Sequence, residues 1–280
     1  MNVPAVILEM ESYRKQVAYG VKDKEKPEPN KSPKEIPVID LKDHDSIQER
    51  VRESFRWVYE TQGYPEFLAF CKRMKSMDFL SQDSFSRAKG ELAEVFLTLT
   101  IEEWIKQNNL SSKWRVYPHY YFSYKSGRGH TEIDVLLVSR NCIVVFEAKS
   151  YAGEKLVVGN CEVKVRGRIT DIYSQNALHC KALYEHIQDL VLAKSGAMKT
   201  VYFSFATGSL SDERTADKRN LMPAIDEEIL PHFLNALEKN ASTVTWSGEI
   251  FSRIESISKE YCTDTHSAEV RKRRRNRWLT

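Results

Sequence analysis

The sequence has few cysteines and no long apolar run. Its five cysteines are scattered, and no two of them form a Cys-x-x-Cys pair. This number and spacing argue against a disulfide framework and against a structural zinc site. No apolar segment approaches the roughly 20 residues that cross a bilayer, and the N-terminus lacks the basic stretch that begins a signal peptide. We therefore expect a cytoplasmic protein with no membrane partner.

Excess positive charge is confined to one segment near the C-terminus. The formal net charge is +3, yet Arg271–Arg277 alone contains six Lys or Arg residues. Without these six charges the rest of the chain carries −3. Affinity for nucleic acid would therefore come from local patches and from this tail, where Trp278 could stack on a base. The alternative is a solvated tail without a partner.

The length and composition fit one sizeable core and a small second module. The chain has 280 residues, of which 41% are hydrophobic and 29% charged, as in ordinary globular proteins. A charged, proline-rich stretch at 21–37 predicts a flexible linker. We expect an N-terminal segment with this linker (1–40), a helical N-terminal module (41–85), a main domain (86–262) and a basic tail (263–280). The helical module is open to a role in homo-oligomer or protein-partner contacts.

The main domain alternates helical and strand patterns. Helical spacing is found at 89–107, 173–191, 225–237 and 250–261, and strand patterns at 114–124, 130–149, 156–169, 200–205 and 242–246. Residues 209–220 have the composition of a polar loop. Two further helices are expected in the N-terminal module, at 47–58 and 66–80. This order predicts an α/β fold with a central mixed β-sheet flanked by helices.

Charged residues interrupt the strongest strand pattern. Two apolar runs, Val135–Val138 and Cys142–Phe146, flank a Ser-Arg-Asn turn and predict a β-hairpin. If the turn is centred near Arg140 and Asn141, Asp134 falls opposite Glu147, with Lys149 on the same face as Glu147. Two carboxylates near an ammonium suggest a divalent metal held by oxygen ligands. The alternative is a pair of solvated strand ends joined by a salt bridge.

Several neighbouring residues also qualify for a role. Glu132 could assist a second metal, although a carboxylate at the strand entry is the favoured explanation. His130 and His179 could contact phosphate or water, but isolated histidines are more often structural. Tyr151 and Lys155 follow Lys149 closely enough to grip a nucleic-acid backbone.

Four motifs, in order, resemble the nuclease-related domain (NERD), a branch of the PD-(D/E)xK restriction-endonuclease-like superfamily. They are Lys-Gly-Glu-Leu-Ala-Glu at 89–94, Glu-Ile-Asp-Val-Leu-Leu-Val at 132–138, Val-Phe-Glu-Ala-Lys-Ser-Tyr-Ala-Gly at 145–153, and Gln-Asn-Ala-Leu-His-Cys-Lys-Ala-Leu at 175–183. The resemblance covers about residues 90–187. It implies a restriction-endonuclease-like core for the main domain.

The resemblance also implies roles for individual residues. Glu94, Asp134 and Glu147 would bind the metal, Lys149 would be the catalytic lysine, and Gln175 would lie at the edge of the site. Where the family usually has a second glycine before the helix glutamate, this chain has Ala93, so Glu91 is the runner-up for that acid. The family's Asn-Pro pair before the glutamine is also absent.

The hypothesis that follows is an Mg²⁺-dependent deoxyribonuclease, in which Mn²⁺ can replace Mg²⁺. Such an enzyme would hydrolyse phosphodiester bonds by in-line attack of water. DNA is favoured over RNA as the nucleic-acid partner on the resemblance alone. The alternatives are a non-cleaving nucleic-acid-binding or partner-docking module of the same fold, and an RNA-directed nuclease.

Overall fold

The computed structural model describes residues 44–76, 86–127, 129–191, 198–205, 207–240, 246 and 248–263. The chain divides into two compact units, Met1–Phe96 and Leu97–Thr280. The boundary falls inside helix α4, Ser86–Gln107. The expected linker at 21–37 and the basic run Arg271–Arg277 lie outside the described residues.

The first unit contains the two helices that the N-terminal pattern predicts. Helix α2 spans His44–Gln62 and α3 spans Tyr64–Ser76. Gly63, at φ 85°, donates its N–H to the Tyr59 carbonyl and ends α2 in a left-handed conformation that glycine adopts easily. The buried rings of the two helices pack together, with Phe55 4.9 Å from Phe70 and 6.1 Å from Phe67 between ring centroids. The aromatic stripes are therefore core, as expected.

The second unit contains the end of α4, nine strands and four further helices in the part of the chain that is described. Its strands are β1 (Trp114–Ser123), β2 (His130–Ser139), β3 (Ile143–Lys149), β4 (Lys155–Val158), β5 (Glu162–Val165), β6 (Arg168–Asp171), β7 (Met198–Ser204), β8 (Leu210–Asp212) and β9 (Ala224–Asp226). Its helices are α5 (Ile172–Ile187), α6 (Ala216–Leu221), α7 (Leu230–Lys239) and α8 (Glu249–Thr263).

A five-stranded mixed sheet forms the centre of this unit, in the order β1-β2-β3-β7-β9. The pairs β1–β2 and β2–β3 are antiparallel, whereas β3–β7 and β7–β9 are parallel. The predicted hairpin is β2–β3. Its turn is held by Ser139, whose hydroxyl accepts the N–H of Cys142 at 3.0 Å. The hairpin thus places β3 in the middle of the sheet.

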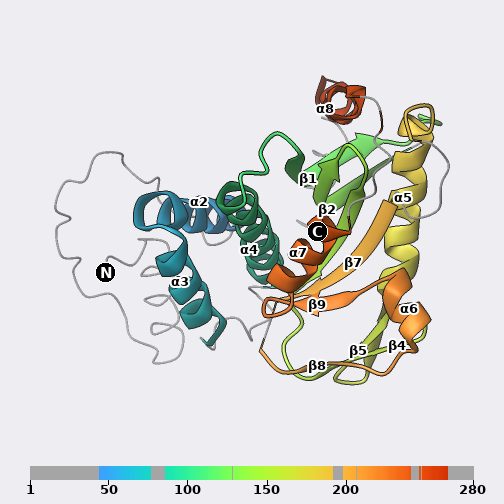
Figure 1. The fold of residues 1–280 in the computed structure, drawn as a ribbon. Coiled ribbons are helices and arrows are strands. Elements are labelled where there is room, and N and C mark those ends of the chain that lie inside the picture. Colours follow the sequence, from blue (N-terminus) through green and yellow to red (C-terminus); the bar gives the residue numbers. More distant parts are fainter. Residues whose placement is uncertain are drawn as a thin grey trace. The chain divides into compact units, whose positions relative to one another are not determined.

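Helices cover both faces of the sheet (Figure 1). Helices α5 and α8 pack on one face, where Ile143 and Val145 of β3 join a buried apolar cluster with Leu183 and Ile254. On the other face the Phe146 ring lies 6.2 Å from the ring of Phe233 in α7. The predicted fold class, α/β with a central mixed sheet flanked by helices, is confirmed.

A second sheet, in the order β6-β5-β4-β8, lies at one end of the main sheet, beside α6 in Figure 1. Strands β4, β5 and β6 occupy the region predicted at 156–169, with turns at the expected glycines, Gly159 and Gly167. Residues 209–220 were expected to be a polar loop, and this is wrong. They contain β8, which pairs in parallel with β4, and α6. Three-residue strands are too short to give a periodic pattern.

The helix expected at 225–237 also needs correction. Residues 224–226 form β9 beside β7, and the helix begins only at Leu230. Asp226 causes the break, because its Oδ1 accepts the N–H groups of Glu228 and Ile229 and so stabilises a turn. The strand expected at 242–246 lies outside the described residues except for Trp246.

Two general features of the described residues bear on function. None of their helices is both long and apolar enough to cross a membrane. Cys71, Cys142, Cys161 and Cys180 carry free thiols. Burial raises the pKa of Cys142 and Cys161 to about 11 and that of Cys180 to about 12. These three thiols therefore stay protonated, and unreactive, at neutral pH.

Candidate functional site

The two acids of the hairpin lie where β2 and β3 separate. The ladder between the strands ends at the pair Val135–Phe146, so Asp134 and Glu147 come one residue beyond it. Asp134 Oδ2 accepts the backbone N–H of Ala148 at 2.8 Å. This bond holds the Asp134 carboxylate between the strand ends and beside Glu147.

Glu147 is fully buried under helix α5. It points to the same face as Ile143 and Val145, which pack against that helix. Its Oε1 accepts hydrogen bonds from Lys149 Nζ and from Gln175 Nε2. Its Oε2 accepts none from the described residues. Burial opposes ionisation, but His179 and Lys149 outweigh it and lower the pKa of Glu147.

Lys149 lies between the two carboxylates. Its Nζ contacts Glu147 Oε1 and is 3.9 Å from Asp134 Oδ2. Burial disfavours the ammonium, yet the negative charges of Asp134 and Glu147 prevail and raise the pKa of Lys149. The side chain is 23% exposed. Lys149 is therefore a cation at neutral pH, with access to a ligand from solvent.

Helix α5 brings Gln175 and His179 to the same site. Asp171 caps the helix by accepting the N–H of Ser174 at 2.9 Å, which fixes the start of α5 next to the sheet. Gln175 then reaches Glu147 from the first turn. His179, one turn further on, bonds Thr131 Oγ1 through Nδ1 at 2.6 Å, and its Nε2 is 3.6 Å from Glu147 Oε2.

Three polar residues at the site were missed or undervalued in the sequence. His179 was expected to be structural, although its i+4 spacing from Gln175 on a helix could have placed both on one face. Tyr202 and Ser204 are buried on β7, opposite Glu147 and Lys149 in the parallel register. Burial raises the pKa of Tyr202, so its phenol is neutral. The strand pattern of 200–205 gave no sign that these two residues would lie opposite Glu147 and Lys149.

The two acids expected from α4 belong to the first unit. Glu91, the runner-up, is buried, and its Oε1 accepts a hydrogen bond from Arg52 Nε at 2.7 Å. Glu94 is partly buried, and the two carboxylates offer oxygens within 4.8 Å of each other. Such an acidic pair suits a divalent cation. The role of Glu94 beside Asp134 and Glu147 stays a prediction.

The other residues singled out in the sequence have simpler environments. Glu132 Oε1 is 3.6 Å from Nδ1 of His119, a residue that adopts a left-handed φ of 46°. His130 begins β2 and is partly buried. The Tyr151 hydroxyl donates to Thr170 Oγ1 at 3.4 Å.

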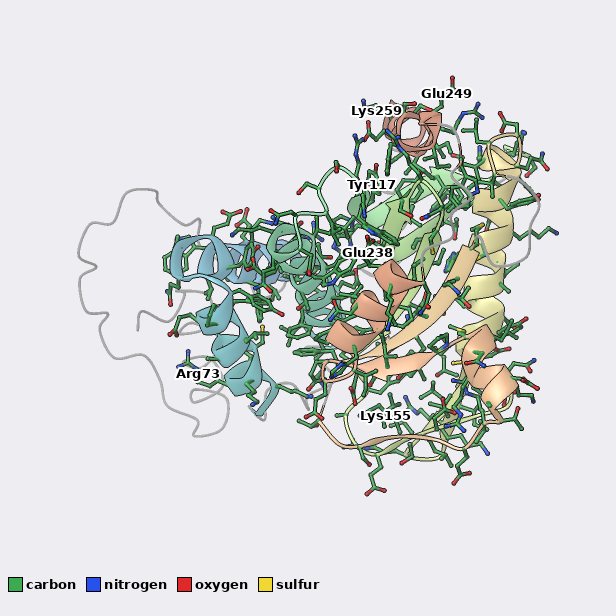
Figure 2. All side chains as sticks on the ribbon, in the orientation of Figure 1. Arg73, Tyr117, Lys155, Glu238, Glu249 and Lys259 are labelled. Atoms are coloured by element: carbon green, nitrogen blue, oxygen red, sulfur yellow. The ribbon has the colours of Figure 1, made fainter. Side chains whose placement is uncertain are left out.

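Lys155 cannot grip a nucleic acid, contrary to expectation. It is only 2% exposed, at the second sheet in Figure 2. Its Nζ donates to the carbonyl oxygens of Gly153 (2.9 Å), Thr207 (3.1 Å) and Gly208 (3.1 Å). The ammonium is thus committed to joining the loop after β3 to the loop after β7.

Comparison with known proteins agrees with the motifs. Residues 88–204 match the family model of the nuclease-related domain, NERD. The match includes Glu94, Asp134, Glu147, Lys149 and Gln175. No curated protein and no solved structure shows a significant match to the chain. The match confirms the resemblance found in the sequence: residues 88–204 are similar to the nuclease-related domain family.

Proposed function

We propose that this domain is a metal-dependent nuclease that hydrolyses phosphodiester bonds of DNA. The observation that carries the proposal is the convergence of Asp134, Glu147 and Lys149 where β2 and β3 separate. An ammonium beside two carboxylates suits a reaction in which negative charge accumulates on phosphate.

The donor atoms fit a hard divalent cation such as Mg²⁺, with Mn²⁺ as a substitute. Glu147 Oε2 is buried, and it accepts no hydrogen bond among the described residues. A buried carboxylate oxygen in this state is costly unless a cation or donor faces it. Asp134 and Glu147 would hold the ion. When bound, Mg²⁺ lowers the pKa of a coordinated water and polarises a phosphate oxygen.

The remaining residues of the site orient the Glu147 carboxylate and neutralise negative charge on the phosphate. Lys149, protonated because of its two acidic neighbours, stabilises negative charge on a phosphate. Gln175 holds Glu147 Oε1, and the Thr131–His179 pair keeps an imidazole nitrogen facing Glu147 Oε2. These contacts fix the orientation of the buried carboxylate.

The test is incubation of the full chain with labelled single-stranded DNA, duplex DNA and RNA, in Mg²⁺, Mn²⁺ or chelator. Asp134→Asn and Lys149→Met remove a charge with little change in volume. We expect each to lower the cleavage rate by about 100-fold or more. Lys181→Met, on the exposed side of α5, is the control. Cleavage that persists in chelator, or in both variants, would contradict the proposal.

One observation favours the rival, a nucleic-acid-binding module without turnover. Glu147 Oε1 is already engaged by both Lys149 and Gln175, so the site is stable with its own charges paired. Binding of DNA without metal-dependent cleavage would support that rival. Cleavage of RNA but not DNA would support the third hypothesis, an RNA-directed nuclease.

A further inference from the structure

The hairpin β5–β6 has an unusual residue in its turn. Arg166 and Gly167 form a two-residue connection closed by the pair Val165–Arg168. Their φ angles are 49° and 79°, as a type I′ turn requires at both central positions. Asn or Gly is normal at the first of these, because a longer L side chain costs roughly 1–2 kcal/mol there. A residue with a long cationic side chain in a strained backbone conformation suggests that the side chain has a function.

The register assigns the side chains of the hairpin to two faces. Val163 and Val165 pair with Thr170 and Arg168, and Val163 is buried, so this face turns toward the core. The opposite face carries Lys164, paired with Ile169, and the two carboxylates of the hairpin, Glu162 and Asp171. Arg168 is therefore on the face that lacks carboxylates.

Two contacts join the arginine face to the loop that follows Lys149. The Tyr151 hydroxyl donates to Thr170 Oγ1, which lies on that face. A methyl group added to Gly153 would be 3.4 Å from Arg166 Nε, so the Arg166 side chain lies over Gly153. Gly153 is four residues beyond Lys149. The guanidinium of Arg166 thus lies over the loop that follows Lys149.

The chain also connects the hairpin to the site from its other end. Strand β6 runs from Arg168 to Asp171, and α5 follows at once with Gln175 in its first turn. At about 3.3 Å per residue, Arg168 is roughly 10 Å along the strand from Asp171. That length corresponds to about three base-pair steps along the axis of duplex DNA.

Both arginines are available to an anion. They are exposed, and neither forms an ion pair with any of the described residues. A guanidinium matches the geometry of phosphate oxygens and binds them through two parallel hydrogen bonds. Arg166 and Arg168 therefore give this side of the hairpin a positive charge. This side lies next to the loop that follows Lys149.

We propose that Arg166 and Arg168 bind the phosphodiester backbone of the DNA strand that enters the site. This inference rests on the proposed function for its substrate. It assigns the β5–β6 hairpin to backbone binding, separate from the chemistry at Asp134, Glu147 and Lys149.

The test measures binding by the full chain to fluorescent single-stranded and duplex DNA in chelator, between about 50 and 200 mM salt. We expect Arg166→Ala/Arg168→Ala to weaken binding and to reduce the slope of log Kd against log salt by about 1.4 for single strands, or 0.7 for each lost phosphate contact. Lys164→Ala, on the opposite face of the same hairpin, should leave the slope unchanged. An RNA arm shows whether the contact distinguishes the two backbones.

A conservative variant separates charge from folding. Arg166→Lys/Arg168→Lys keeps both charges and should restore most of the slope, which a merely structural role would not explain. An unchanged slope in the double alanine variant, or an equal loss in Lys164→Ala, would overturn the inference, as would wild-type protein that binds no DNA. If the double alanine variant has a reduced slope and the wild-type protein does not cleave DNA, the hairpin binds the backbone and the nuclease proposal is wrong. If the wild-type protein cleaves DNA and the double alanine variant has an unchanged slope, the nuclease proposal is supported and the role of the hairpin is wrong.

Discussion

Glu147 uses its two carboxylate oxygens differently. Oε1 is saturated by donors from Lys149 and Gln175, whereas Oε2 faces His179 at 3.6 Å. Because the group is fully buried, its orientation is set by these neighbours and not by water. The orientation of the carboxylate would therefore be fixed before a cation binds at Oε2.

Gln175→Ala tests this orientation. Removing a partner that orients a metal ligand typically costs 10–100-fold in metal affinity or activity. We expect the Mg²⁺ concentration for half-maximal cleavage to rise by about 10-fold or more, measured by titrating Mg²⁺ at fixed DNA. Gln188→Ala, exposed just after α5, is the control. A titration curve that matches wild type would show that Gln175 does not support the metal site.

For single residues, the sequence predicts some environments correctly and others wrongly, and the difference has a physical reason. Asp134, Glu147 and Lys149 could be found because two-residue alternation and one turn fix which strand residues face each other. Lys155 was misjudged because a lysine in a polar stretch usually extends into solvent. The carbonyls that hold it include those of Thr207 and Gly208, about 50 positions away in the chain. Only the tertiary structure brings them together.

In the β5–β6 turn, the residue proposed to bind DNA, Arg166, is also one that lowers the stability of the protein. Arg166→Gly should raise the free energy of unfolding by about 0.5–1 kcal/mol, because glycine removes the left-handed strain but loses more backbone entropy on folding. Affinity for DNA should fall at the same time. Urea denaturation measures the first effect.

A matched variant in the same hairpin should show the opposite sign. Arg168 lies in strand β6, where glycine costs roughly 0.5–1 kcal/mol. Arg168→Gly should therefore destabilise the protein. Equal destabilisation by both variants would show that Arg166 is not strained.

The loops after β3 and β7 depend on Lys155 for their junction. In Lys155→Met the carbonyls of Gly153, Thr207 and Gly208 lose a shared cationic donor, and each hydrogen bond to a charged group is worth roughly 1.5–3 kcal/mol. We expect a loss of about 3 kcal/mol or more in urea denaturation, against almost none for the exposed Lys181→Met. A loss below about 0.5 kcal/mol, within the range of ordinary surface substitutions, would contradict this role.

At the scale of elements, the long patterned segments could be predicted and the short ones could not. The β2–β3 hairpin and α5 have strong periodicity and clear turn or cap residues. Strand β8 ends in an ion pair, shortly before helix α6, between the partly buried Asp212 and the buried Arg214, with Nη2–Oδ2 at 2.6 Å. Charged residues are mostly exposed unless they are paired, so the sequence of this segment resembles that of an exposed loop.

For the whole molecule, this ion pair predicts how stability depends on pH. Burial opposes ionisation of Asp212, but Arg214 outweighs it and lowers the pKa of the carboxyl. The stabilisation is therefore present above the unfolded-state pKa of about 3.9 and is lost as pH falls through the folded-state value. We expect the free energy of unfolding at pH 7 to exceed that near pH 3, measured by urea denaturation at both.

Asp212→Asn should remove part of this pH dependence and destabilise the protein by about 3 kcal/mol at pH 7. The reason is that the Arg214 side chain is fully buried, and its charge would lose its partner. Asp217→Asn, exposed on α6, is the control. An Asp212→Asn protein with wild-type stability at pH 7 would contradict the assigned pair.

The central claim concerns the whole domain: that it cleaves DNA with a metal ion, using the charge of Lys149. The most direct measurement is the cleavage rate of labelled DNA in Mg²⁺ by wild-type protein and by Lys149→Met, with chelator as the blank. The account predicts metal-dependent cleavage by wild type and a rate at least about 100-fold lower in the variant. Equal rates for the two proteins would contradict it.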